Sequence, residues 1–60
     1  MIKAIIVEDD PMVAQINKQY LTEFRDIEVQ GLFGNGSDAI SFLMENTVDL
    51  IILDITMPVI

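Results

Sequence analysis

Residues 48–54 read VDLIILD, and this stretch decides the fold that the sequence predicts. Residues 50–53 are apolar without alternation, which is the pattern of a β-strand buried on both faces of a parallel sheet. The run ends on a carboxylate, Asp54. In open α/β sheets the ligand site lies just beyond the carboxyl ends of the strands. Asp54 is therefore either a solvated residue at a strand end or a functional group.

A second apolar run, residues 4–7, has the same pattern and is followed by EDD at residues 8–10. Two parallel strands that both end in acidic residues bring several carboxylates to one edge of a sheet. Like charges that lie close together repel, and their removal from water costs free energy. A hard divalent cation with oxygen ligands resolves this conflict, and Mg2+ is the usual partner of phosphoryl chemistry. The sequence thus predicts a Mg2+ pocket built from Glu8, Asp9 and Asp54.

The composition excludes several other chemistries. The chain has 60 residues, at most one small domain, and contains neither cysteine nor histidine. Disulfides, thiolate or imidazole metal sites and histidine acid–base catalysis are therefore excluded. A formal net charge of −7 argues against nucleic-acid binding by this segment, because such binding needs a basic face. No apolar run is long enough to span a membrane, and residues 1–4 lead directly into a strand, unlike a signal peptide. We expect a cytoplasmic protein without a membrane partner.

The chain in order alternates strand and helix patterns. We expect strands over residues 2–7, 27–33 and 48–53. The middle strand alternates apolar and polar residues, which suits an edge strand with one wet face. The order β-α-β-α-β predicts an α/β fold, a flavodoxin-like doubly wound parallel sheet. A full domain of this kind has five βα units, so we expect residues 1–60 to be its N-terminal half.

Two helices connect these strands. Asp10 is expected to cap the first helix, with Pro11 at its first position and the helix end near residues 24–25. Ser37 is expected to cap the second helix, after a turn at residues 34–36 whose glycines tolerate positive φ. The first helix is amphipathic, and its expected buried side consists of Met12, Val13, Ile16, Tyr20, Leu21 and Phe24. Asp49 is expected to be solvated.

Residues 5–11 (IIVEDDP) and 51–58 (IILDITMP) together resemble the receiver domain of bacterial two-component response regulators. The first stretch matches the family's acidic pair after strand one, and the second matches the Asp-x-x-Met-Pro around its phosphoacceptor. Residues 33–36 (FGNG) also resemble the family's segment between strand two and helix two. The residues PMVA at 11–14 and NKQYL at 17–21 are most similar to regulators of the citrate and C4-dicarboxylate sensing type.

The resemblance implies a role for each site residue. Asp54 would be the phosphoacceptor and a metal ligand, and Asp9 would bind Mg2+ directly. Glu8 would act mainly through metal-bound water, and the backbone carbonyl of Thr56 would complete the ligation. The implied partners are a sensor histidine kinase and, only through an output domain absent from this chain, DNA. The family's Ser or Thr after strand four and Lys after strand five are also absent, and Val59 departs from the small or polar residues usual after Met-Pro.

Two other functions remain open at this stage. Haloacid-dehalogenase-type phosphatases also place a nucleophilic Asp after an apolar strand, and Asp54 with Thr56 partly fits their pattern, although Pro58 does not. A non-signalling structural fragment that keeps the fold is the third reading. We also expect the strand at residues 48–53 to be an unprotected edge through which an isolated chain associates, swaps elements or stays largely unfolded.

Overall fold

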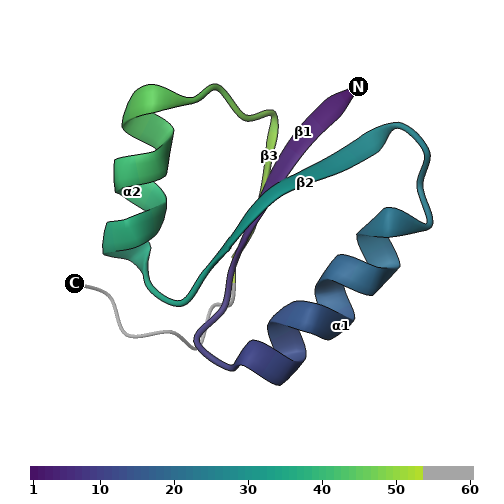
Figure 1. The fold of residues 1–60 in the computed structure, drawn as a ribbon, viewed down its shortest axis with the longest axis horizontal. Coiled ribbons are helices and arrows are strands. Elements are labelled where there is room, and N and C mark those ends of the chain that lie inside the picture. Colours follow the sequence, from purple (N-terminus) through teal and green to yellow (C-terminus); the bar gives the residue numbers. More distant parts are fainter. Residues whose placement is uncertain (54–60) are drawn as a thin grey trace.

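The structure, a computed structural model, describes residues 1–53. Three strands form one parallel sheet in the order β2-β1-β3 (Figure 1). This is the beginning of the strand order 2-1-3-4-5 of flavodoxin-like doubly wound folds, so the predicted fold class is confirmed. The elements in chain order are β1 (Ile2–Val7), α1 (Pro11–Thr22), β2 (Ile27–Phe33), α2 (Gly36–Glu45) and β3 (Leu50–Leu53).

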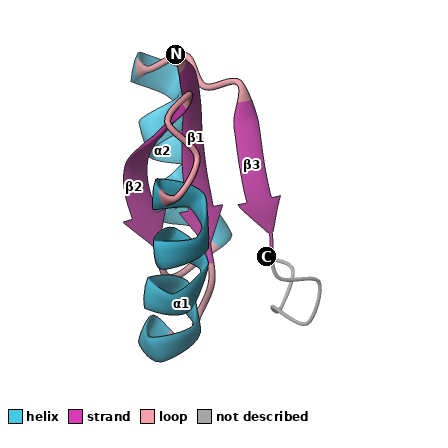
Figure 2. Cartoon of the chain, turned by 90° about the vertical axis from the view of Figure 1, so that its right-hand side faces the viewer, coloured by secondary structure: helices cyan, strands magenta, loops and turns pink. Residues whose placement is uncertain are grey.

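The two helices lie on opposite faces of the sheet (Figure 1). The chain moves from β1 to β2 in one direction and from β2 past β1 to β3 in the other, and right-handed crossovers therefore place α1 and α2 on different faces. Both helices pack against β1 and β2. Within the described part of the chain neither helix contacts β3, which lies beside β1 at one edge of the sheet in Figure 2.

The core is built on the central strand β1. Residues 4–7 are all buried, and Ile5 and Ile6 are the largest side chains that are fully enclosed. Ile5 and Val7 form a cluster with Ala39 of α2, against which Phe33, Phe42, Leu43 and Val48 pack. The prediction of a strand covered on both faces is confirmed for β1.

The same prediction is wrong for β3. Ile51 is 45% exposed and Leu53 is 60% exposed, and the strand begins at Leu50 rather than at residue 48. The reason is that β3 pairs only with β1 and neither described helix reaches it. β3 is therefore one edge of the described sheet, as expected, and β2 is the other.

Helix α1 meets the sheet with only the margin of the side that was predicted to be buried. Ala14 is its only buried residue, and Leu21, which was predicted to be buried, is partly buried together with Asn17 at helical spacing beside it. Met12 is 73% and Tyr20 64% exposed. The apolar stripe is thus wider than the surface that α1 rests on, and only its margin meets β1 and β2. The helix also ends at Thr22, two residues before the predicted end.

The caps of the helices are local features. The Asp10 carboxylate accepts from the backbone N–H groups of Met12 and Val13, and Pro11 begins α1, as predicted. The expected Ser37 cap of α2 is wrong, because the helix already begins at Gly36 and the Asn35 side chain accepts from the Asp38 N–H at 2.8 Å. The chain bends at Gly34 and Asn35, as expected, but no glycine in the described residues has positive φ.

A bulge in β2 changes which side chains face each helix. Ala4 pairs with Val29 but Ile5 pairs with Gly31, which leaves Gln30 without a register partner on β1. Because neighbouring residues of a strand point to opposite faces, the extra residue reverses the alternation from that point. Val29 shares a face with Ala4, whereas Phe33 shares the opposite face with Val7. The single alternation predicted for residues 27–33 is therefore wrong beyond the bulge.

Candidate functional site

The three strands end level with one another at the carboxyl edge of the sheet. Val7 is the register partner of Phe33 in β2 and of Leu53 in β3. The residues that follow β1 are Glu8 and Asp9, the acidic pair that the sequence placed at this edge. The carboxyl edge is where doubly wound sheets hold their ligands.

Glu8 is the only buried charged side chain in residues 1–53, with 7% of its surface exposed. Its backbone N–H donates to the Phe33 carbonyl at 2.9 Å, which extends the contact between β1 and β2 by one residue. One carboxylate oxygen, Oε2, accepts from the Asp10 N–H at 3.1 Å. A carboxylate removed from water needs such partners, and this one fixes the Glu8 side chain to its own loop.

Asp10 links this loop to helix α1. Its N–H donates to Glu8, and its Oδ1 accepts from the Met12 N–H at 2.9 Å and the Val13 N–H at 3.4 Å. The carboxylate of Asp10 is thus engaged as an N-cap, as the sequence predicted. The result is a short, hydrogen-bonded turn that carries the acidic pair.

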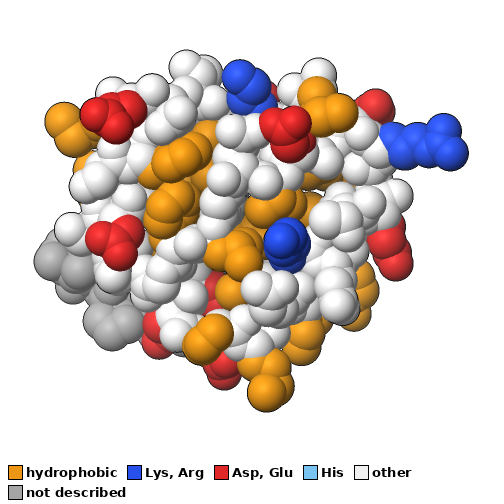
Figure 3. Space-filling model, in the orientation of Figure 1, with side chains coloured by type: hydrophobic (Ala, Val, Ile, Leu, Met, Phe, Trp, Pro, Cys, Tyr) orange, Lys and Arg blue, Asp and Glu red, His pale blue; other side chains and the backbone are white. Residues whose placement is uncertain are grey.

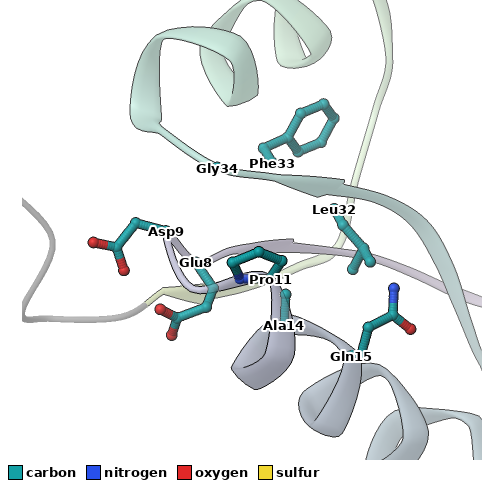
Figure 4. Close-up of a pocket in the computed structure, with 8 residues that line it drawn as sticks. All are labelled: Glu8, Asp9, Pro11, Ala14, Gln15, Leu32, Phe33 and Gly34. Carbon is teal, nitrogen blue, oxygen red and sulfur yellow. The ribbon is translucent and has the colours of Figure 1, made fainter.

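Asp9 is exposed, in contrast to Glu8. Figure 4 shows both carboxylates projecting to the same side of the β1–α1 loop, away from Gln15. Within residues 1–53 no three acidic side chains come close enough to hold a metal ion together. The other two predicted ligands, Asp54 and Thr56, lie outside the described residues.

A surface pocket of about 180 Å³ adjoins the acidic pair (Figure 4). It is lined by the loop that follows β1, by the end of β2 and by the first turns of α1. Most of its wall is apolar, and Glu8 and Asp9 supply its acidic side. The lining residues are Glu8, Asp9, Pro11, Ala14, Gln15, Leu32, Phe33 and Gly34.

The charge distribution agrees with a cation site and not with an anion site. The chain has ten acidic and three basic residues. On the face shown in Figure 3 the basic side chains stand apart from one another, so this face has no basic patch.

Sequence reasoning missed one contact at the other end of the sheet. Asp49 is exposed, as the sequence predicted, but its Oδ2 also accepts from the Lys3 N–H at 2.9 Å. Its own N–H donates to the Lys3 carbonyl at 2.7 Å. The two residues are 46 positions apart, so no local pattern could have indicated this contact.

The parallel α/β sheet with acidic residues at its carboxyl edge defines the class of domain, and comparison with known proteins names the family. Residues 4–60 match the model of the response regulator receiver domain. The chain belongs to this family, and the match does not favour the phosphatase reading that the sequence had left open. No helix in residues 1–53 is long and apolar enough to cross a membrane.

Several curated proteins are similar to the chain. The transcriptional regulatory protein MalR of Bacillus subtilis is 45% identical over 58 residues, which are 97% of this chain and 25% of that protein. The probable C4-dicarboxylate response regulator DctR of the same organism is 39% identical over 93% of this chain and 25% of its own length. The transcriptional regulatory protein YpdB of Escherichia coli K12 is 41% identical over 93% of this chain and 23% of its length. The chain thus spans about a quarter of these relatives, and no solved structure gives a significant match.

Proposed function

We propose that the chain is the N-terminal half of a phosphoacceptor receiver of a two-component system, which takes a phosphoryl group from a sensor histidine kinase onto Asp54. The observation that carries this proposal is the acidic pair at the carboxyl edge of a sheet whose third strand ends level with the first. Membership of the receiver family supports it.

The donor set of the edge suits Mg2+. Only oxygen ligands are available, and hard cations prefer them. We assign Asp9, Asp54 and the Thr56 carbonyl to direct ligation, and Glu8 to contact through metal-bound water. The exposure of Asp9 leaves it accessible, whereas burial and the Asp10 hydrogen bond hold Glu8 in one orientation. When bound, the ion would neutralise charge on the transferring phosphoryl group.

The Asp54 carboxylate is the nucleophile of the transfer. One of its oxygens attacks phosphorus, and the bond between phosphorus and the kinase histidine nitrogen breaks, with the electron pair leaving on nitrogen. The product is an aspartyl phosphate. We infer a self-modifying signalling domain that hydrolyses its phosphate slowly, not an enzyme that turns over a substrate.

The names of the relatives support a proposal for the output of the protein. MalR and YpdB are described as transcriptional regulators, and DctR as a probable C4-dicarboxylate response regulator. We propose that this chain also belongs to a cytoplasmic regulator of transcription, of the citrate or C4-dicarboxylate sensing type. DNA would be bound through an output domain that lies outside residues 1–60.

We also propose that the isolated chain self-associates through β3. This strand is an edge of the described sheet, carries no proline or glycine, and exposes Ile51 and Leu53. Such an edge can pair with a second chain. Sedimentation with amide hydrogen exchange tests this, and a monomer with strong protection across residues 50–53 would contradict it.

Phosphorylation is the decisive test of the main proposal. In a complete receiver domain that contains this chain, acetyl phosphate should label Asp54 in a reaction that requires Mg2+. Asp54→Asn should abolish the label and Asp9→Ala should weaken it. Asp26→Asn is the matched control. It removes one charge just before β2, at the end of the sheet where the strands begin.

Two results would contradict the proposal. One is labelling of Asp54→Asn at the rate of the unaltered domain, and the other is labelling that persists without Mg2+. The chain of residues 1–60 alone should react poorly, because the hydroxyl and lysine that the family supplies from strands four and five are not in it. Equal labelling of both lengths would show that these groups are unnecessary.

A further inference from the structure

Asp49 connects the beginning of β3 to β1 through two hydrogen bonds. Its carboxylate accepts from the Lys3 N–H, and its own N–H donates to the Lys3 carbonyl. The next register pair is Ala4 with Leu50, followed by three more pairs up to Val7 with Leu53. Asp49 therefore makes the first contact of the β1–β3 ladder, and the side chain contributes one of its hydrogen bonds.

The packing of β3 does not choose this register completely. All four residues of the strand are leucine or isoleucine, and Leu50 and Ile52 are partly buried whereas Ile51 and Leu53 are exposed. A shift by one position would exchange the two faces, but a shift by two positions keeps each face aliphatic. The contact of Asp49 with Lys3 at the start of the strand opposes that second shift.

The register at the start of β3 sets the position of its end. Leu53 lies opposite Val7, and in the sequence Asp54 follows Leu53 while Glu8 follows Val7. A shift by two residues keeps each side chain on its face but moves the strand end by about 6.6 Å. Mg2+ requires oxygen atoms at about 2.0–2.1 Å in a nearly octahedral arrangement and cannot follow such a shift.

We propose that Asp49 is a positioning residue for the phosphoacceptor site. Its carboxylate fixes the register of β3 on β1 and so keeps Leu53, the residue before Asp54, opposite Val7, the residue before Glu8; this inference rests on the proposed function of Asp54. Asp49 acts as a hydrogen-bond acceptor, and its negative charge is incidental. The effect passes along the four residues of β3, from the start of the strand beside Lys3 to its end beside Val7.

The test uses a complete receiver domain that contains this chain, in four variants. Asp49→Ala removes the acceptor, and Asp49→Asn keeps an acceptor oxygen without the charge. Glu45→Ala removes one exposed charge at the end of α2, away from β3. Gly31→Ala destabilises the packing of Phe33 on the α2 face without touching β3. Each variant is measured for Mg2+ affinity, for the rate of labelling by acetyl phosphate, for unfolding in urea, and for interstrand nuclear Overhauser effects between β1 and β3.

We expect Asp49→Ala to lose about 10- to 100-fold in Mg2+ affinity and labelling rate, as for residues that orient metal ligands. Its β1–β3 Overhauser pattern should change as well. Asp49→Asn and Glu45→Ala should stay close to the unaltered domain. Gly31→Ala should unfold at lower urea yet keep the Mg2+ affinity of the folded state, which separates positioning from general stability.

Three results would overturn the role of Asp49: an unchanged affinity in Asp49→Ala, an equal loss in Asp49→Asn, or an equal loss in Gly31→Ala. If Asp49→Ala does not fold, Asp49→Asn is compared with Asp49→Gln, whose longer side chain displaces the acceptor. Loss of affinity in Asp49→Gln alone supports the proposal, and equal affinities overturn it. Absence of Mg2+-dependent labelling in the unaltered domain would instead overturn the proposed function.

Discussion

Strands β1 and β3 have nearly the same kind of sequence but opposite environments. Residues 4–7 and residues 50–53 are both continuous apolar runs followed by an acidic residue. β1 is enclosed by β2, β3 and both helices, and its last four residues are buried. β3 has β1 on one side and no described helix on either face, and Ile51 and Leu53 remain exposed. An apolar run therefore predicts that a strand forms, whereas its burial depends on which elements come to lie over it.

The largest expected effect is a difference between equivalent isoleucines of the two strands. Ile5→Ala should cost about 2–5 kcal/mol of unfolding free energy, because it empties a fully enclosed site. Ile51→Ala, at the register partner of Ile5, should cost less than half of that loss. Urea unfolding of both variants under identical conditions measures the difference.

Equal losses of unfolding free energy in these two variants would contradict the contrast between β1 and β3, because they would mean that β3 is covered in solution. A dilution series then identifies the cover. A loss at Ile51 that disappears on dilution would indicate a second copy of the chain, in line with the proposed self-association through the strand edge.

The next effect concerns the layer that covers β1 on the α2 side. A methyl group at Gly31 would lie 2.9 Å from Cζ of Phe33, whose ring packs on Phe42 with 5.2 Å between the centroids. Gly31→Ala should therefore destabilise by about 1–3 kcal/mol through overpacking. Gly34→Ala is the matched control, since no atom lies within 4 Å of the added carbon. Equal urea midpoints for the two variants would show that Phe33 moves freely.

A smaller effect is expected from Mg2+, which would join the ends of β1 and β3. If the dissociation constant is about 1 mM, about 10 mM Mg2+ should stabilise the fold by roughly 1.4 kcal/mol. Thermal unfolding with and without the ion measures this, and amide exchange should show the gain at residues 50–53. Asp9→Ala should weaken the response while Asp26→Ala keeps it, and an equal response in both would remove Asp9 from the site.

The smallest effect concerns the cap of helix α2, which covers β1. Asn35→Ala removes the acceptor of the Asp38 N–H and should cost about 1 kcal/mol. Ser37→Ala should leave stability nearly unchanged, because Ser37 lies inside the first turn and makes no cap. Circular dichroism during thermal unfolding compares them, and a larger loss in Ser37→Ala would restore the cap that the sequence had indicated.

The sequence by itself determined the features that depend on neighbours along the chain. The strand–helix order and its fold class follow from hydrophobic periodicity. The Asp10 cap and the Pro11 start of α1 follow from backbone chemistry within three residues. The place of Glu8 and Asp9 at the carboxyl edge follows from the direction of a parallel strand, whereas the predictions for Asp54 and Thr56 stay predictions.

Only the tertiary structure decided the features that depend on residues far apart in the sequence. These are the exposure of Ile51 and Leu53, the reversed alternation after Gln30, and the contact of Asp49 with Lys3 across 46 positions. Periodicity shows which side chains of one element are apolar. It does not show which element packs against them, or which residues of two strands pair with each other. Burial and strand register depend on these contacts between distant parts of the chain, so only the tertiary structure shows them.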